Sequence, residues 1–198
     1  MIAICKRQLQ FAVFAAVITT GFAASARLAR TIQAEFGCYG FNRLPGDSAG
    51  PDASVTFLGP PFGPGTAALD HAEHAAERTL TLPGGGVQPG ASWPGNPGIA
   101  WTAETAFFAL SDAATGEHGR ASMLLSWLAA HRTPLGALPE QVTAAGQPAS
   151  VAPLAWTDAA VLLALTAQAH ALPRVHVPPG GQAVSGDCLL PPLTVVGR

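Results

Sequence analysis

The chain has 198 residues, enough for one domain with a hydrophobic core or for part of a larger domain. Hydrophobic residues make up 48% of it and charged residues only 11%, which excludes a disordered polar chain and indicates a surface that is partly covered by something else. The net charge is −2 with no run of basic residues, which excludes a surface built to neutralise nucleic-acid phosphates.

The N-terminal segment allows two interpretations. An apolar stretch from Leu9 to Ala24 follows two basic residues, and Ala24-Ser25-Ala26 resembles a cleavage site, so residues 1–26 have the pattern of a secretory signal. The apolar residues also recur at helical spacing, and this face continues to Phe36 without a break. That continuity favours a helix from about Gln8 to Glu35, and a cytoplasmic over a secreted location, although the sequence alone leaves the location unknown. The apolar run is too short and too rich in Ala and Thr for a stable membrane span.

Hydrophobic periodicity and stop signals predict four further helices. They are expected at Thr66 to Leu80, Ile99 to Thr115, after Gly119 to His131, and Trp156 to Ala171. Gly116 is a favourable C-terminal stop, and the short connection that follows predicts an antiparallel helical hairpin. Thr157 or Asp158 is expected to cap the start of the last helix.

Long loops separate these helices, as the 22 glycines and 18 prolines require. Residues 39–64, 83–98 and 133–153 are expected to be irregular, and no segment shows the alternation of a strand. We therefore predict an all-α fold of helical hairpins with long Gly/Pro-rich loops, and we expect the functional residues in the loops.

Cysteine and histidine give little sign of a metal or redox site. Cys5, Cys38 and Cys188 are far apart and odd in number, so isolated thiols are expected rather than a disulfide framework. His71 and His74 lie three residues apart on a predicted helix without a nearby third ligand. No nucleotide-binding fingerprint is present. The sequence predicts neither a metal nor a cofactor.

Glu140 is the candidate for chemistry among the 12 carboxylates. It lies on a loop fixed by Gly136 and Pro139, and Trp156 begins the helix that follows. A carboxylate on a rigid loop beside aromatic rings suits a sugar site, because the rings stack on apolar sugar faces and the carboxylate transfers protons. Eight of the other carboxylates are expected to be solvated charges or helix-end residues: Glu35, Asp70, Glu73, Glu77, Glu104, Asp112, Glu117 and Asp158.

The order of several motifs resembles that of a known family. An Asp-Ala-Ser segment precedes a Gly-rich loop with tryptophans after it, then a Leu-Pro-Glu-Gln loop and a Pro-Leu-Ala-Trp helix start. These motifs lie at Pro51 to Leu58, Gly84 to Val87 with Trp93 and Trp101, Gly136 to Val142, and Pro153 to Ala159. From roughly Ile18 to Ala171 the chain resembles the C-terminal half of the family 15 glycoside hydrolases, the glucoamylase-type enzymes.

The resemblance implies a six-hairpin (α/α) toroid, of which residues 1–172 would form a part and residues 173–198 an irregular tail. It implies that Glu140 is the general base of an inverting hydrolase acting on an oligosaccharide or α-glucoside, while a second carboxylic acid protonates the leaving oxygen. Trp101, Trp156 and Trp93 are then candidates for substrate binding, although core packing is an equally ordinary role for a tryptophan.

The chain also departs from the family. The family's general acid lies in a Trp-Glu loop upstream, and nothing before Asp52 fits it; the Gly-rich loop has Val87-Gln88-Pro89-Gly90 where members carry Arg-Tyr-Pro, and Thr157 replaces a serine. We therefore expect a truncated portion that is inactive alone, exposes apolar helix faces and pairs with the missing N-terminal half of the barrel. The alternative is a non-catalytic carbohydrate-binding or structural helical remnant.

Overall fold

The computed structural model describes residues 21, 23–45 and 49–173, so the predictions for residues 1–20 and for most of the 173–198 tail lie outside the described residues. The described residues up to Cys38 belong to one compact unit and those from Tyr39 onward to another. A helix at residues 23–36 leads into the 3-10 turn η1 (Gly37–Tyr39). Cys38 is disulfide-bonded, so the expectation of isolated thiols is wrong for this residue. Separation along the sequence does not limit which cysteines meet in space.

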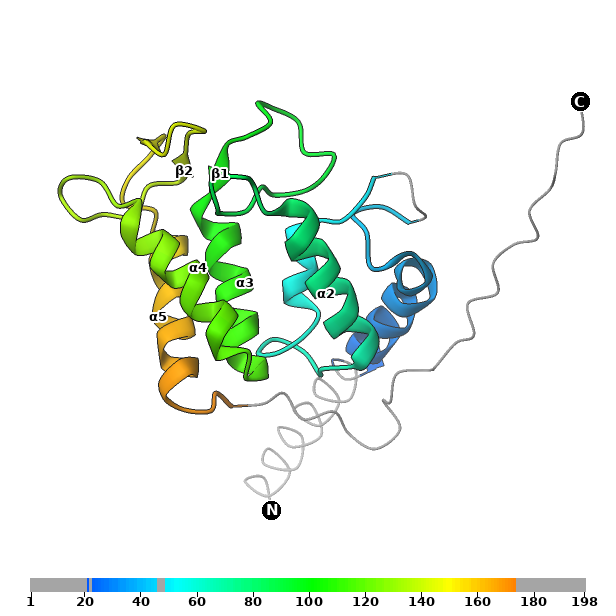
Figure 1. Cartoon of the computed structure of the whole chain (residues 1–198). Helices are drawn as coiled ribbons and strands as arrows, with labels where there is room; N and C mark the ends of the chain where they lie inside the picture. The colour runs from blue at the N-terminus through cyan, green and yellow to red at the C-terminus, as the bar shows by residue number, and fades with distance from the viewer. Residues whose placement is uncertain (1–20, 22, 46–48, 174–198) are drawn as a thin grey trace, which may run out of the picture. The chain divides into compact units, whose positions relative to one another are not determined.

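The second unit is mostly helical, with α2 (Ala67–Leu80), α3 (Thr102–Thr115), α4 (His118–Ala130) and α5 (Ala155–Ala169) (Figure 1). The hydroxyl of Thr66 accepts a hydrogen bond from the backbone N–H of Leu69 and so caps α2. Gly116 ends α3 with a left-handed φ of 94°. The four predicted helices are confirmed. No helix in the described part of the chain is long and apolar enough to cross a membrane.

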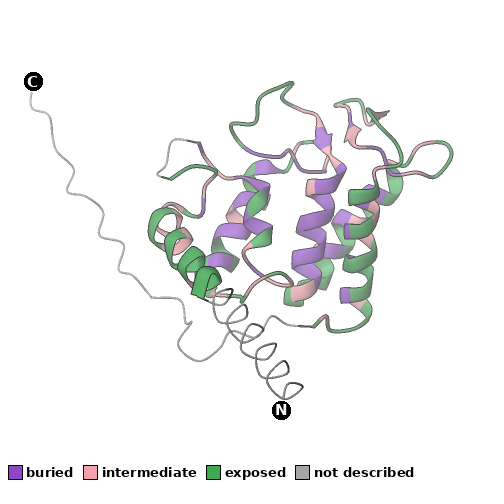
Figure 2. Cartoon of the chain, turned by 180° about the vertical axis from the view of Figure 1, so that it is seen from behind, coloured by how far each residue is buried: buried purple, intermediate pink, exposed green. Residues whose placement is uncertain are grey.

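The helix α3 is the centre of this unit. It packs most extensively against α5 and α4, and the turn at Gly116 makes α3 and α4 the predicted hairpin. Figure 2 shows α3 as almost wholly buried. The face of α5 that meets it is narrow and made of small residues, which lets the two helices approach closely. These residues are Thr157, Ala160, Ala164 and Ala167.

Two loops predicted to be irregular contain short regular elements. The 3-10 helix η2 (Ala53–Phe57) lies in the 39–64 loop. The strands β1 (Ala100–Trp101), β2 (Gln141–Val142) and β3 (Pro148–Ala149) form an antiparallel sheet in the order β1-β2-β3. The expectation of no strands is therefore wrong, because two-residue strands are too short to show alternation. The fold class is all-α as predicted, and the small sheet lies within the loops.

The helix α5 leaves several large apolar side chains exposed. Its exposed residues include Trp156, Leu162, Leu163 and Leu165, whose exposed fractions run from 42% to 65%. A buried helix face of this composition would normally stabilise a domain by removing apolar surface from water. The expected exposure of an apolar helix face is confirmed for α5.

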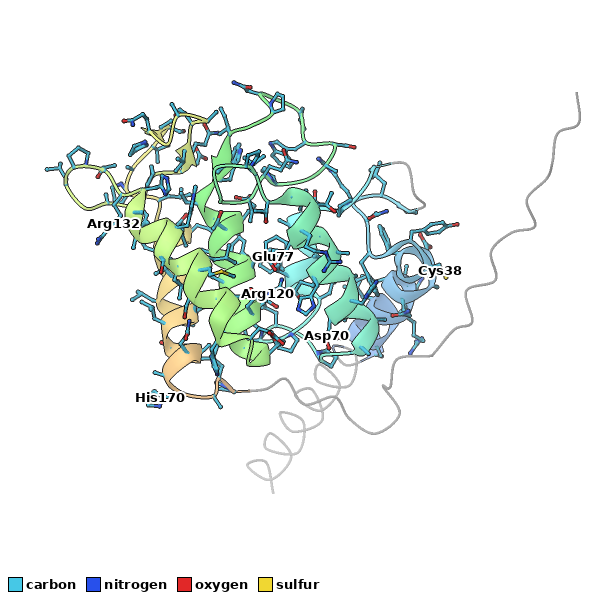
Figure 3. The ribbon with its side chains drawn as sticks, viewed as in Figure 1. Cys38, Asp70, Glu77, Arg120, Arg132 and His170 are labelled. Carbon is cyan, nitrogen blue, oxygen red and sulfur yellow. The ribbon has the colours of Figure 1, made fainter. Side chains whose placement is uncertain are left out.

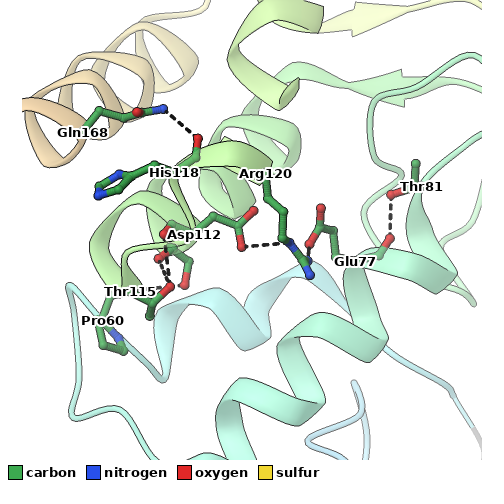
Figure 4. Close-up of polar contacts among 9 residues, drawn as sticks. Pro60, Glu77, Thr81, Asp112, Thr115, His118, Arg120 and Gln168 are labelled. Atoms are coloured by element: carbon green, nitrogen blue, oxygen red, sulfur yellow. Dashed lines mark hydrogen bonds and ion pairs between the residues drawn. The ribbon is translucent and has the colours of Figure 1, made fainter. Parts of the chain in front are cut away.

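A charged network joins α2, α3 and α4. Arg120 of α4 forms an ion pair with Glu77 of α2, and its Nε lies 3.5 Å from Oδ1 of Asp112 of α3. Figure 3 shows Arg120 and Glu77 pointing toward one another, and Figure 4 shows Arg120 between the two carboxylates. Glu73, one turn before Glu77, is also buried. Three carboxylates therefore lie near one guanidinium.

The expectation that Glu73 and Asp112 are solvated charges is wrong. They are 6% and 3% exposed, and one oxygen of each carboxyl is buried without a hydrogen-bond partner among the described residues. Burial raises the pKa of Glu73 to about 7 against an opposing hydrogen bond with Ser111. Burial, together with the nearby carboxylates of Glu73 and Glu117, raises the pKa of Asp112 to about 7. Arg120 carries one positive charge, so it cannot neutralise all three carboxylates.

Candidate functional site

Glu140 lies where the loop after α4 enters β2, at the end of the unit where α3 and α5 begin (Figure 1). Its backbone N–H donates to the carbonyl of Val151 over 2.8 Å, and its own carbonyl accepts from the N–H of Thr102 over 3.0 Å. The Thr102 hydroxyl donates to the carbonyl of Pro139 and lies 2.8 Å from the Thr157 hydroxyl. Residues in the first turns of α3 and α5 therefore hold the backbone around Glu140 in place.

This arrangement overturns the predicted cap of α5. The N-cap position is Leu154, without a side-chain hydrogen bond, and Thr157 is fully buried. The Thr157 hydroxyl faces α3 and meets Thr102 there. A residue that resembles a helix cap in sequence serves instead as a contact between two helices.

The side chain of Glu140 is half-buried and held by one neighbour. The Ser150 hydroxyl donates a hydrogen bond to its Oε2. Ser150 has a φ of 63°, in the left-handed region that costs a non-glycine residue about 1–3 kcal/mol. Such strained residues cluster at functional sites, where the surrounding structure holds them. Ser150 is a candidate site residue that the sequence pattern did not identify.

Trp93 and Trp101 are brought together next to this loop. Trp101 ends β1 directly opposite Gln141, the residue after Glu140. Its ring centroid lies 6.0 Å from that of Trp93, at an interplanar angle of 74°. Trp93 is 42% exposed, so much of its ring surface remains free for a ligand. Two of the three predicted tryptophans therefore lie at the same end of α3 as Glu140.

Trp156 makes its aromatic contacts with other residues than Trp93 and Trp101. It occupies the first turn of α5, and its ring packs edge-on against Phe107, with centroids 5.5 Å apart. Phe107 in turn contacts the Phe57 ring at 4.8 Å. The aromatic contacts of Trp156 therefore join it to the helix core rather than to the Trp93–Trp101 pair. Its role in substrate binding stays a prediction.

Two further carboxylates face the same end of the unit. Asp52 caps η2 by accepting the N–H of Ser54 over 3.0 Å, and its Oδ2 lies 3.9 Å from Nε of Arg43. Glu104 lies in the first turn of α3. Burial raises the pKa of Glu104, its own backbone N–H opposes the rise, and the charges of Asp52 and Glu140 add to it. Glu104 therefore lies close enough to Asp52 and Glu140 for both charges to act on it. The sequence pattern explained Glu104 only as a favourable charge at a helix start.

The Gly-rich loop packs on Trp127 of α4 instead of contributing polar groups to this site. The indole N–H of Trp127 donates to the Gly84 carbonyl over 2.9 Å. Gly85 and Gly86 have left-handed φ values of 75° and 72°, and a Cβ on either would lie within 2.6 Å of the Trp127 ring. His131 lies against the same ring, and its Nδ1 contacts the Trp127 carbonyl, one of the last carbonyls of α4, at 2.7 Å.

A cavity of about 430 Å³ lies at the other end of α3. Its lining includes Ala114 and Thr115 at the end of α3, Thr66 at the start of α2, and prolines of the 60–64 segment. A helix of this length spans about 20 Å, which separates the cavity from Glu140. Its lining residues include two threonines, Thr66 and Thr115, and a single carboxylate, Asp70. We therefore take the loop end around Glu140, where several polar and aromatic groups lie close together, as the candidate site.

Within the described ranges, no three His, Cys, Asp or Glu side chains are grouped so as to hold a metal ion. What the loop end does offer is an anchored carboxylate, two adjacent indole rings and an arginine. Such a set suits hydrogen bonding and ring stacking with a polar, ring-shaped ligand.

Comparison with known proteins gives a likeness in fold. A solved structure named "Glycosidase Wild Type" superposes with a TM-score of 0.66 and 24% sequence identity. The match covers 76% of this chain and 44% of that chain, so this chain spans less than half the length of the glycosidase. No protein-family model matches the sequence, and no curated protein gives a significant match. The chain has a glycosidase-like fold, a partial (α/α) toroid of helical hairpins with long loops.

Proposed function

We propose that this chain is a portion of an inverting α-glucoside hydrolase of family 15, the glucoamylase type, and that Glu140 is its general base. The observation that carries the proposal is the fixed position of Glu140. Its backbone is hydrogen-bonded to the start of α3, and its carboxylate accepts a hydrogen bond from Ser150. Trp101 lies on the neighbouring strand. A base must hold a water molecule in one geometry, and an anchored carboxylate meets that requirement.

An inverting reaction needs two carboxyl groups. Glu140 would take a proton from water on one face of the sugar, while a carboxylic acid roughly 6.5–9.5 Å away would protonate the leaving oxygen. The resemblance puts that acid in a loop upstream of Asp52, in the half of the barrel that this chain does not supply. We therefore expect the 198 residues alone to bind sugar without appreciable turnover.

The uncovered face of α5 supports a larger assembly. Leu162, Leu163 and Leu165 expose apolar surface, and the glycosidase that shares the fold is more than twice as long as the matched segment. We propose that the rest of the toroid covers this face. The occupant would be the missing N-terminal half of the barrel, and its partner surface would be apolar.

Binding of a cationic iminosugar tests the role of Glu140. We expect 1-deoxynojirimycin to bind the purified chain, since its ammonium group pairs with a carboxylate, and we expect Glu140→Gln to weaken it by about tenfold or more. Glu117→Gln, in the turn at the far end of α3, is the matched control and should bind as the unchanged protein does. Titration calorimetry gives both affinities.

Each result has a distinct meaning. If Glu140→Gln binds the iminosugar as tightly as the unchanged chain does, the ligand does not contact Glu140, and the proposal that Glu140 is the general base is wrong. Absence of binding by the unchanged chain, to the iminosugar and to maltose, would favour the structural helical remnant. If the 198 residues alone hydrolyse maltose or trehalose at the rate of an intact enzyme, the proposal that the chain lacks the general acid is wrong.

A further inference from the structure

Arg43 and Asp52 form a small cluster with Trp93, next to Trp101. The Cζ of Arg43 lies 4.9 Å from the centroid of the Trp93 ring, and its Nε lies 3.9 Å from Asp52 Oδ2. Trp93 in turn meets Trp101. The cluster therefore runs from the 39–64 loop across the 83–98 loop to β1, whose partner strand begins next to Glu140.

Backbone hydrogen bonds fix the two loops against each other. The N–H of Ala53 donates to Pro89, and the N–H of Ala91 donates to Pro51, at 2.8 and 2.9 Å. Gly90 allows this approach, because a Cβ there would lie 2.7 Å from Asp52 Oδ2. The cluster is held by main-chain contacts and does not depend on the Arg43–Asp52 pair for its form.

The exposure of the cluster leaves donors free for a ligand. The Arg43 side chain is 36% exposed, while that of Asp52 is nearly buried. Of the five N–H donors of a guanidinium, described residues engage only the Nε side, at a distance too long for a strong hydrogen bond. The guanidinium covers one face of the Trp93 ring, and the indole still exposes 42% of its surface.

The charge balance of the cluster selects the kind of ligand. Asp52 compensates the charge of Arg43, so an anionic group such as a phosphate or uronate gains little attraction there. A neutral molecule with many hydroxyl groups can accept from the guanidinium, and its apolar ring face can stack on an indole.

We propose that Arg43 and Trp93, with Asp52 compensating the charge of Arg43, form a saccharide-binding subsite next to Glu140. One sugar ring packs against the part of the Trp93 indole that Arg43 leaves uncovered, and the free Arg43 donors bond to hydroxyl groups of the saccharide. The subsite rests on the proposed function and extends it, because it holds a second sugar unit of a substrate whose first unit reaches Glu140. Arg43 is a positioning residue for that unit.

Comparison of a two-ring with a one-ring ligand tests the subsite. We expect Arg43→Ala and Trp93→Ala to weaken maltose binding by about tenfold or more, with 1-deoxynojirimycin binding little changed, because the single ring occupies the Glu140 position. Arg78→Ala, which removes an exposed arginine from α2, is the control and should leave both affinities unchanged. Thermal unfolding of each variant shows whether it is folded.

Nuclear magnetic resonance of the unchanged chain gives a readout that does not depend on the folding of the alanine variants. Maltose should shift the indole N–H signal of Trp93, which is assigned by its loss in Trp93→Phe. Unchanged maltose affinity in folded Arg43→Ala, or a Trp93 signal that maltose does not move while the iminosugar still binds at Glu140, overturns the subsite and leaves the proposed function standing. Absence of binding by both ligands overturns both.

Discussion

The hydroxyl groups of Thr102 and Thr157 lie 2.8 Å apart and join the first turns of α3 and α5. The Thr102 hydrogen is already donated to the Pro139 carbonyl, so Thr157 is the donor between the two threonines. Both side chains are fully buried. This short chain of hydrogen bonds ties the loop that carries Glu140, the proposed base, to two helices and fixes the backbone of that loop.

Replacing Thr102 with valine should destabilise the unit by about 1–3 kcal/mol, because the buried Pro139 carbonyl and Thr157 hydroxyl lose their partner while the volume is kept. Urea unfolding followed by circular dichroism measures the change. Thr79→Val is the control, since the Thr79 hydroxyl bonds to the Ala75 carbonyl on the exposed side of α2. A Thr102→Val variant as stable as this control would show that the contact contributes nothing.

Stability should fall as pH rises from about 4 to about 7. Glu73 and Asp112 have native pKa values of about 7, above their ordinary values of 4.5 and 3.8, so the folded state holds more protons across this range. The loss attributable to Glu73 is about 3 kcal/mol as an upper figure. Unfolding temperatures at pH 5 and pH 8 measure the slope.

Glu73→Gln isolates the contribution of Glu73 to this slope. The pKa of His74 is lowered by burial, so His74 acts in the opposite direction near its ordinary value of 6.5 and remains in the variant. We expect Glu73→Gln to flatten the decline, whereas Asp158→Asn, a partly exposed acid in α5, should leave it intact. If the stability of Glu73→Gln falls with pH as steeply as that of the unchanged protein, Glu73 is not buried as a protonated carboxyl.

Replacing Arg120 with methionine should cost more than the roughly 1 kcal/mol of an exposed ion pair, since Glu77 would keep a largely buried charge without its partner. The double variant Arg120→Met with Glu77→Gln should recover part of that loss. Arg132→Met provides a control at an exposed arginine. If the double variant is no more stable than Arg120→Met, the two residues are not coupled.

The three consecutive glycines should differ in their tolerance of a methyl group. Gly85→Ala and Gly86→Ala put a Cβ against the Trp127 ring at a left-handed φ, which costs at least about 1–2 kcal/mol for the backbone alone. Gly84→Ala meets no atom within 4 Å and should be nearly neutral. Differential scanning fluorimetry ranks the three. Equal stability of all three variants would show that the loop does not pack on Trp127.

Local signals in the sequence determined the helices. The periodic apolar positions of α2, its Thr66 cap and the Gly116 stop of α3 act within a few residues, so they were visible without a structure. The motif order around Glu140 was visible for the same reason, as each motif is continuous along the chain. Trp93 and Trp101 could be named as candidates, but their contact could not.

Tertiary structure decided where charge and polarity are buried. Glu73 and Asp112 look like surface acids, and they are buried because α2, α3 and α4 close over them. Thr157 looks like a cap and instead bonds across to α3. Arg43 meets Asp52 within its own loop and Trp93 in the next loop, 50 residues further along the chain. The free energy of a charged or polar side chain depends on neighbours remote in sequence, and only the folded chain brings those neighbours together.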